Sequence, residues 1–213
     1  MADEPTPGPE GGASATALLG GGHLDYCLAL GRFVDEFGQV ETLLVRLFRH
    51  MAGVDRETAV AVFSGVRIKD AMSFIGRLLE VKPCPALDMA ELKEVFAQLT
   101  AITQIRNDVL HYGATRGEDG QFTVSNALAA LTPAKARETA VSPDILYALC
   151  DDLTKIMIHI VMFSAAIISG RRIDDLPEPL TGVRHRAWRH KRAAPAPKGT
   201  RPPPTSPKRP RPP

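Results

Sequence analysis

Apolar residues recur along this chain at the three- and four-residue steps that place them on one face of a helix. The longest stripe, from Leu30 to Met51, spans more turns than the usual globular helix and is typical of helical bundles. Similar stripes, with turn and cap signals at their ends, predict helices over residues 24–51, 55–63, 69–81, 88–112 and 142–169. The pattern therefore predicts an all-α helical bundle.

Between the fourth and the last of these helices the pattern changes from helical to extended. A Gly-Glu-Asp-Gly turn signal at residues 117–120 precedes residues 121–125, which are rich in aromatic and β-branched side chains. We expect residues 121–125 to pair with residues 112–116 as a small β-hairpin, with one more short strand at residues 138–141. The hairpin is inserted into the bundle and is not expected to be a core sheet.

Composition divides the 213 residues into one domain and two ends that lack the apolar density needed to fold. Residues 1–22 contain Gly, Pro, Ala and small polar residues and are expected to form a disordered leader. No basic segment precedes an apolar run there, so we expect no secretory signal and a cytoplasmic protein. The helical domain is assigned to residues 23–183, and a disordered, basic, proline-rich tail to residues 184–213.

The predicted tail carries a large share of the positive charge. Ten of the 26 Lys and Arg residues, and none of the 24 Asp and Glu residues, lie in residues 184–213, so the tail is basic and residues 1–183 are acidic. Nine prolines in the same tail disfavour helix and sheet. The tail could be an electrostatic arm for nucleic acid, or a solubilising segment attracted to its own acidic body, and composition alone does not separate these readings.

The cysteines and histidines give no sign of a metal site. Cys27, Cys84 and Cys150 are widely spaced without a CxxC pair, which argues against a disulfide framework and a zinc knuckle. We expect all three to be buried small hydrophobic residues. No HxxxE or HExxH spacing supports a metal, and we expect neither a metal nor another cofactor.

The last helix is apolar nearly all round, which indicates either a central helix of the bundle or one shared with a second subunit. Its apolar run of residues 156–168, with Lys155 before it and His159 and Ser164 inside it, falls short of the roughly 20 residues that a bilayer requires, so we expect a buried helix and no membrane span. We expect His159 to be a core or interface histidine with a hydrogen-bond partner. Of the two arrangements we favour a homodimer.

The stretch from Gln104 to Gly113 contains the residues best suited to chemistry. At about 100° per residue, Asn107 and His111 lie one turn apart on a face that borders the apolar stripe. The long side chain of Arg106, at the edge of the stripe, can reach both. Gly113 then ends the helix, so Arg, Asn and His can converge on one small volume.

This stretch resembles the signature of the HEPN superfamily of small all-α domains, an Arg followed four to six residues later by a His and often written R-N-x-x-x-H. Here the signature reads Arg106-Asn107-Asp108-Val109-Leu110-His111. The following Gly113 and the long first helix that carries Glu41 also look like that family. By helix layout the resemblance covers roughly residues 24–170, and it implies a HEPN-like helical bundle.

The resemblance further implies a metal-independent endoribonuclease of a toxin–antitoxin, defence or RNA-processing system. RNA would be its substrate, and an antitoxin or other protein a further partner. It would act as a homodimer in which two motifs face one composite cleft, with Arg106, Asn107 and His111 as catalytic residues. His111 could act as base or acid near neutral pH, Arg106 could offer fixed charge to the phosphate, and Asn107 could orient a phosphate oxygen or the 2′-OH.

Other readings of the same residues stay open. A non-catalytic dimeric helical module could use this fold to bind a nucleotide, an RNA or a protein partner. His111 could simply interact with the helix dipole, and Arg106 could form a structural ion pair with Glu41. Glu41 interrupts the apolar stripe of the first helix and could instead reach water at the border of that stripe. Tyr112 could add a hydroxyl, offer a base-stacking surface or only pack.

Overall fold

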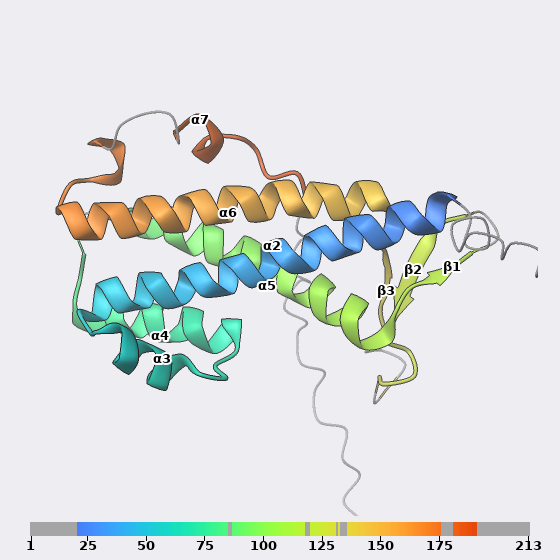
Figure 1. The fold of residues 1–213 in the computed structure, drawn as a ribbon, viewed down its shortest axis with the longest axis horizontal. Coiled ribbons are helices and arrows are strands. Elements are labelled where there is room, and N and C mark those ends of the chain that lie inside the picture. The colour runs from blue at the N-terminus through green and yellow to red at the C-terminus, as the bar shows by residue number, and fades with distance from the viewer. Residues whose placement is uncertain are drawn as a thin grey trace, which may run out of the picture.

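The structure is a computed structural model that describes residues 21–84, 87–117, 120–130, 132, 136–175 and 181–190. This part of the chain is mostly helical with one small sheet, as the hydrophobic pattern predicted (Figure 1). The elements are α2 (Gly21–Ala52), α3 (Arg56–Phe63), α4 (Ile68–Val81), α5 (Met89–Tyr112), β1 (Thr115–Arg116), β2 (Phe122–Ser125), β3 (Glu138–Ala140), α6 (Pro143–Ser169), the 3-10 helix η2 (Ile173–Asp175) and α7 (Thr181–Arg184).

The long helices α2 and α6 lie side by side and run in the same direction, and their seam forms the core (Figure 1). Near the start of the seam the Arg32 guanidinium lies 5.9 Å from the centre of the Tyr147 ring. The seam buries large apolar side chains completely, among them Phe33, Leu44 and Leu47 of α2 and Leu146, Leu149, Leu153, Ile156 and Phe163 of α6. Helix α5 runs antiparallel to α6 (Figure 1) and adds Leu92, Leu99 and Ile102 to the same core.

The predicted helix ends agree closely with the observed ones because local chemistry sets them. Asp55 caps α3 by accepting a hydrogen bond from the Thr58 backbone N–H at 2.7 Å, and Ser142 caps α6 by accepting one from Ile145 N–H at 3.3 Å. Gly170 ends α6 in the left-handed conformation, with φ 66° and ψ 9°. The five predicted helices are confirmed with shifts of a few residues at most.

The predicted hairpin is present, but its position relative to the core was predicted wrongly. Strands β1, β2 and β3 form one antiparallel sheet in that order, with Thr115 opposite Thr123. Phe122 and Val124 are buried, and Tyr26 of α2 stacks on Phe122 with ring centroids 4.3 Å apart. Because alternate residues of a strand face the same side, β2 turns both buried side chains towards the end of the bundle.

The expectation that all three cysteines are buried also needs correction. Of the three cysteines only Cys150 is buried, whereas Cys84 is half-buried and Cys27 is exposed. Cys27 follows the buried Tyr26 directly, and neighbouring helical residues point about 100° apart, so Cys27 faces away from the core.

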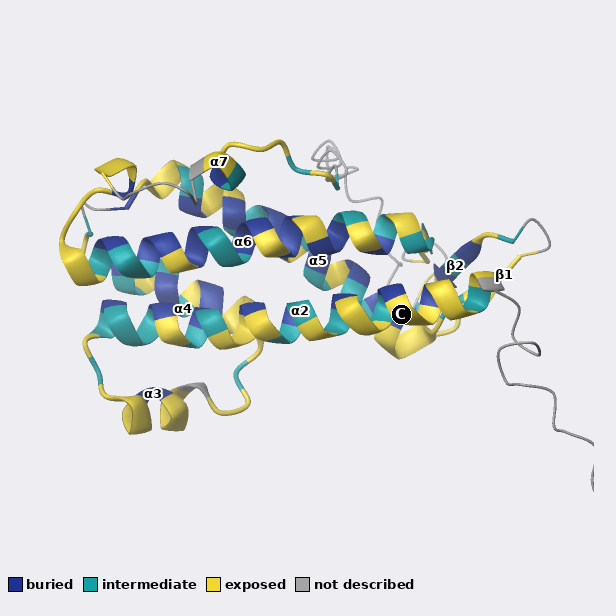
Figure 2. Cartoon of the chain, turned by 45° about the horizontal axis from the view of Figure 1, so that its top comes forward, coloured by how far each residue is buried: buried dark blue, intermediate teal, exposed yellow. Residues whose placement is uncertain are grey.

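Helix α6 is the one described helix that is long and apolar enough to cross a membrane by length and composition. A core helix has the same composition, and Leu149, Leu153 and Ile156 are fully buried against the bundle. The other side of α6 carries exposed positions (Figure 2). The apolar Ile168 of this helix is 67% exposed. We therefore interpret α6 as a core helix with a partly exposed outer stripe.

Residues 184–190 cross the outer side of α5 and α6, and we call this segment the strap (Figures 1 and 2). Arg184 is buried and Trp188 is half-buried. The prediction of a disordered tail from Arg184 is therefore wrong for residues 184–190. The rest of that predicted tail and residues 1–20 of the predicted leader lie outside the described residues, whereas Gly21 and Gly22 open α2.

Candidate functional site

The R-N-x-x-x-H motif lies on the last two turns of α5. Gly113 ends this helix with φ 66°, a conformation that favours glycine. Arg106 donates a hydrogen bond from Nη1 to Asn107 Oδ1 at 3.2 Å, and its guanidinium lies 5.3 Å from the centre of the Phe37 ring of α2. The structure thus brings the Arg and the Asn of the motif together, and α2 supports the arginine.

His111 follows one turn after Asn107 and is exposed, as is Tyr112. The two rings meet edge to face with centroids 6.4 Å apart. Within the described residues the His111 side chain forms no hydrogen bond or ion pair. A ligand can therefore reach the imidazole from solvent, but none of those residues orients it.

The predicted ion pair between Glu41 and Arg106 is wrong. No such pair is formed between these two described residues, and Glu41 is exposed on α2 beside Val45 and Val66. The Arg106 guanidinium is occupied by Phe37 and Asn107 instead, and its Nε is buried without a hydrogen bond in the described part of the chain. Glu41 therefore reaches water at the border of the stripe, which was the alternative reading.

Asp108, inside the motif, has a structural role that the sequence analysis missed. It is buried, and one of its oxygens accepts hydrogen bonds from Arg137 Nη2 at 2.9 Å and from Gln104 Nε2 at 3.0 Å. Arg137 lies just before β3, so Asp108 ties the sheet to α5. The sequence did contain a signal for this role. Asp108 lies three residues after Ile105 and one before Val109, on the apolar stripe that the helix buries.

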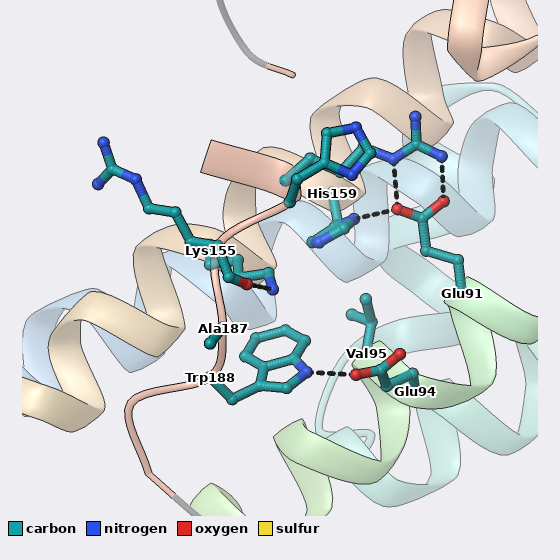
Figure 3. A pocket seen from close by; sticks show the side chains of 10 residues that line it. Glu91, Glu94, Val95, Lys155, His159, Ala187 and Trp188 are labelled. Atoms are coloured by element: carbon teal, nitrogen blue, oxygen red, sulfur yellow. Dashed lines mark hydrogen bonds and ion pairs between the residues drawn. The ribbon is translucent and has the colours of Figure 1, made fainter. Parts of the chain in front are cut away.

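A second polar cluster lies where the strap crosses the first half of α5 and the middle of α6 (Figure 3). Arg184 donates from Nε and Nη2 to the two oxygens of Glu91, the second at 2.6 Å, and from Nη1 to Asp174 at 2.7 Å. His159 Nδ1 lies 3.0 Å from Glu91 Oε1. Burial by itself would raise the pKa of Glu91, but the contacts with His159 and Arg184 prevail and lower it to about 2.

Lys155 and Trp188 form the middle of this cluster. The Lys155 ammonium lies 3.9 Å from the centre of the Trp188 ring and donates a hydrogen bond to the Arg186 carbonyl. Trp188 Nε1 donates to Glu94 Oε1 at 2.6 Å. Burial lowers the pKa of Lys155, although the carboxylate of Glu94 opposes that shift.

The third part of the cluster binds the backbone of the strap. The buried Asp152 carboxylate accepts hydrogen bonds from the backbone N–H groups of Arg189 at 2.7 Å and His190 at 2.8 Å. Gln98 Nε2 donates to Asp152 at 2.9 Å and to the His190 carbonyl at 2.8 Å. An acid and an amide inside the protein thus hold two consecutive peptide units of the strap.

Some buried polar atoms under the strap have no hydrogen bond within the described residues, namely Gln98 Oε1 and both ring nitrogens of His159. The approach of His159 Nδ1 to Glu91 is close, but its angle departs from that of a hydrogen bond. His159 is therefore a core histidine, as expected, and Glu91 is its ion-pair partner, but neither ring nitrogen has the expected hydrogen bond among the described residues. A cavity of about 270 Å³ adjoins His159.

The sequence contained only an indirect signal for this cluster. The basic tail and the acidic body suggested mutual attraction, and the contacts of the strap with Glu91, Glu94 and Asp151 fit that reading for residues 184–190. Polar residues on the apolar last helix were a second signal, since Asp152 is buried next to the strap. Neither signal indicated which acid meets which base.

The comparisons with known proteins assign no function to either cluster. No family model matches the chain, and neither a curated protein nor a solved structure matches it significantly. Among the residues that the structure describes, no group of three or more His, Cys, Asp and Glu side chains could hold a metal ion.

Proposed function

We propose that the chain is a metal-independent endoribonuclease of the HEPN type, with Arg106, Asn107 and His111 as its catalytic residues. One observation carries the proposal: the hydrogen-bonded Arg106–Asn107 pair lies one turn from an exposed His111 at the end of α5. The proposal takes these three groups, a planar cation, an amide and an imidazole, to act on one phosphodiester.

The chemistry uses the nucleophile that RNA itself contains, the 2′-OH. Cleavage requires a base for the 2′-OH proton, an acid for the departing 5′-oxygen and positive charge beside the phosphorane. His111 serves as base or acid, and Arg106 supplies the charge. Because Asn107 Oδ1 accepts from Arg106, its Nδ2 donors remain to orient a phosphate oxygen. The products are a 2′,3′-cyclic phosphate and a 5′-OH.

The proposal requires a homodimer, because one chain contributes one His111 and the reaction needs both an acid and a base. A two-fold axis near the end of α5 would place the second His111 in the same cleft. Leu110 and Tyr112 beside the motif are 43% and 42% exposed, and a dimer contact at this end would cover them.

The test is incubation of the purified protein with total RNA or transfer RNA in EDTA. We expect cleavage that ends in cyclic phosphates and that falls by about 10²-fold or more in His111→Ala and in Arg106→Ala. Arg46→Ala is the matched control, since Arg46 is an exposed arginine of α2 away from the motif. An RNA left intact by concentrated wild-type protein, or normal cleavage by both variants, would show the proposal to be wrong.

A second candidate is a non-catalytic dimeric helical module that binds a nucleotide, RNA or a protein partner. The packing of Arg106 on Phe37 favours it, because that contact gives the arginine a structural use. Under this alternative RNA binds without being cleaved, and His111→Ala leaves its affinity unchanged. A place in a toxin–antitoxin or defence system, an antitoxin partner, a cytoplasmic location and the absence of a membrane association are predictions that go with either candidate.

A further inference from the structure

We propose that the groove beneath the strap is a recognition site for an extended basic peptide of a partner protein, and that the strap occupies this site as a built-in competitor. The groove lies between α5 and α6, where Glu91, Glu94, Lys155 and His159 line the cavity beside the strap (Figure 3). Gln98 and Asp152 extend it along the strap by their hydrogen bonds to residues 189 and 190. The inference is independent of the ribonuclease proposal, because it concerns a different part of α5.

Two side-chain contacts define what the groove selects. Glu91 offers both oxygens to one guanidinium, a geometry that arginine matches and lysine does not. Four residues further along the strap, the Trp188 ring contacts the Lys155 ammonium and its Nε1 donates to Glu94. A ligand of this groove therefore needs an arginine followed at the fourth position by a tryptophan.

The remaining contacts read the peptide backbone and so do not depend on the side chains of the ligand. Asp152 accepts two consecutive N–H groups, while Gln98 and Lys155 each donate to a carbonyl. Sites for extended peptides obtain affinity in this way, from main-chain hydrogen bonds, and obtain specificity from a few side-chain pockets. Proline is excluded at the two positions whose N–H groups meet Asp152.

Two polar atoms of the groove form no hydrogen bond with the strap. The strap buries Gln98 Oε1 and His159 Nε2 without giving either a hydrogen bond from the described residues. The strap already has a side-chain donor at His190, but its imidazole does not satisfy Gln98 Oε1, so a peptide with a longer donor such as Lys or Arg at this position would supply the missing hydrogen bond. Such a ligand can replace the strap even though the strap has the advantage of being tethered.

Charge selects a peptide over a nucleic acid for this site. Glu91, Glu94 and Asp152 outnumber the lysine of the groove, and the exposed Asp151 adds to the negative rim. A polyanion would be repelled there, whereas a basic segment is attracted.

The test uses the fact that Trp188 is the sole tryptophan of the chain. Full-length Arg184→Ala/Trp188→Ala protein has a weakened strap and no tryptophan, so a capped peptide of residues 184–190 supplies the only indole signal in the mixture. We expect the fluorescence anisotropy of the peptide to rise and saturate with added protein. Trp188→Ala/Arg189→Pro is a second background that retains the Arg184–Glu91 pair and removes one N–H from the strap.

Controls separate specific binding from charge attraction. A scrambled peptide of the same composition, and Asp152→Asn protein in either background, should each bind about tenfold more weakly or worse, because each loses charge-assisted hydrogen bonds. Equal binding of the scrambled peptide, or no saturable binding in either folded background, would overturn the proposal. A wild-type dimer that dissociates in Trp188→Ala would place a second copy's strap in the groove and overturn the assignment to a different protein.

Discussion

Arg184 donates two hydrogen bonds from its guanidinium to the carboxylate of Glu91, which lies 93 positions earlier in the chain. Both side chains are largely buried, at 7% and 16% exposure. Their contact fastens the start of the strap to the acidic helix α5. It is also the most buried ion pair of Arg184, whose other partner, Asp174, is 62% exposed, so its loss leaves a poorly compensated charge in a largely buried place.

Replacing Glu91 by glutamine should therefore lower the free energy of unfolding by about 3 kcal/mol, since Arg184 would lose its buried partner and keep only the largely exposed Asp174 as a counter-charge. Urea unfolding followed by circular dichroism measures this loss. The emission of Trp188 should shift to longer wavelength as the strap loosens. Asp151→Asn is the control, because Asp151 and Arg189 form an exposed pair whose removal should change stability by less than about 1 kcal/mol.

Stability should fall as the pH drops from about 4.5 towards 2. The folded-state pKa of Glu91 is lowered to about 2 from its usual 4.5, so its contribution is complete above the unfolded-state value and disappears as the carboxylate is protonated. Melting temperatures of the wild type and of Glu91→Gln across this range measure the effect. A wild type whose pH dependence in this window equals that of the variant would contradict the role of Glu91.

Arg106→Ala and His111→Ala should differ in their effect on stability, although both side chains are proposed to be required for cleavage. Arg106→Ala removes the contact with Phe37 and the hydrogen bond to Asn107 and should cost about 1–2 kcal/mol. His111 is exposed, touches only the exposed Tyr112 ring and forms no hydrogen bond or ion pair among the described residues, so His111→Ala should stay within about 0.5 kcal/mol of wild type. Thermal melts of the two proteins compare them, and an unstable His111→Ala would contradict the exposed position.

Glu41→Ala should leave the melting temperature nearly unchanged. Glu41 is exposed and forms no ion pair with Arg106, so its removal should change stability by less than about 0.5 kcal/mol. A decrease of several degrees in a thermal scan would restore the pairing that the structure contradicts.

Local signals account for the part of the fold that the sequence predicted well. Asp55 and Ser142 cap their helices by bonds to N–H groups three residues away, and Gly113 and Gly170 end theirs through a conformation that favours glycine. These interactions join neighbours along the chain, so reading a short stretch is sufficient to find them. The same holds for the spacing of Arg106, Asn107 and His111 on one helix.

Contacts between residues that are distant along the chain could not be predicted from short stretches of sequence. Glu41 and Arg106 have opposite charges and fit a pairing by composition, yet the guanidinium lies over Phe37. Whether Arg106 meets Glu41 or Phe37 depends on how α5 and α2 are rotated relative to each other when they pack. A stripe on one helix gives no measure of that rotation.

The sequence by itself determined the five main helices, the turn-rich insertion and the local geometry of the Arg-Asn-His motif, because periodicity, caps and glycines act over a few residues. The tertiary structure decided the rest. It brought the strap onto α5 and α6, buried Asp152 and Lys155 beneath it and joined Arg184 to Glu91. These contacts arise only when helices distant in the chain pack together and exclude water, which makes the match of each charge decisive.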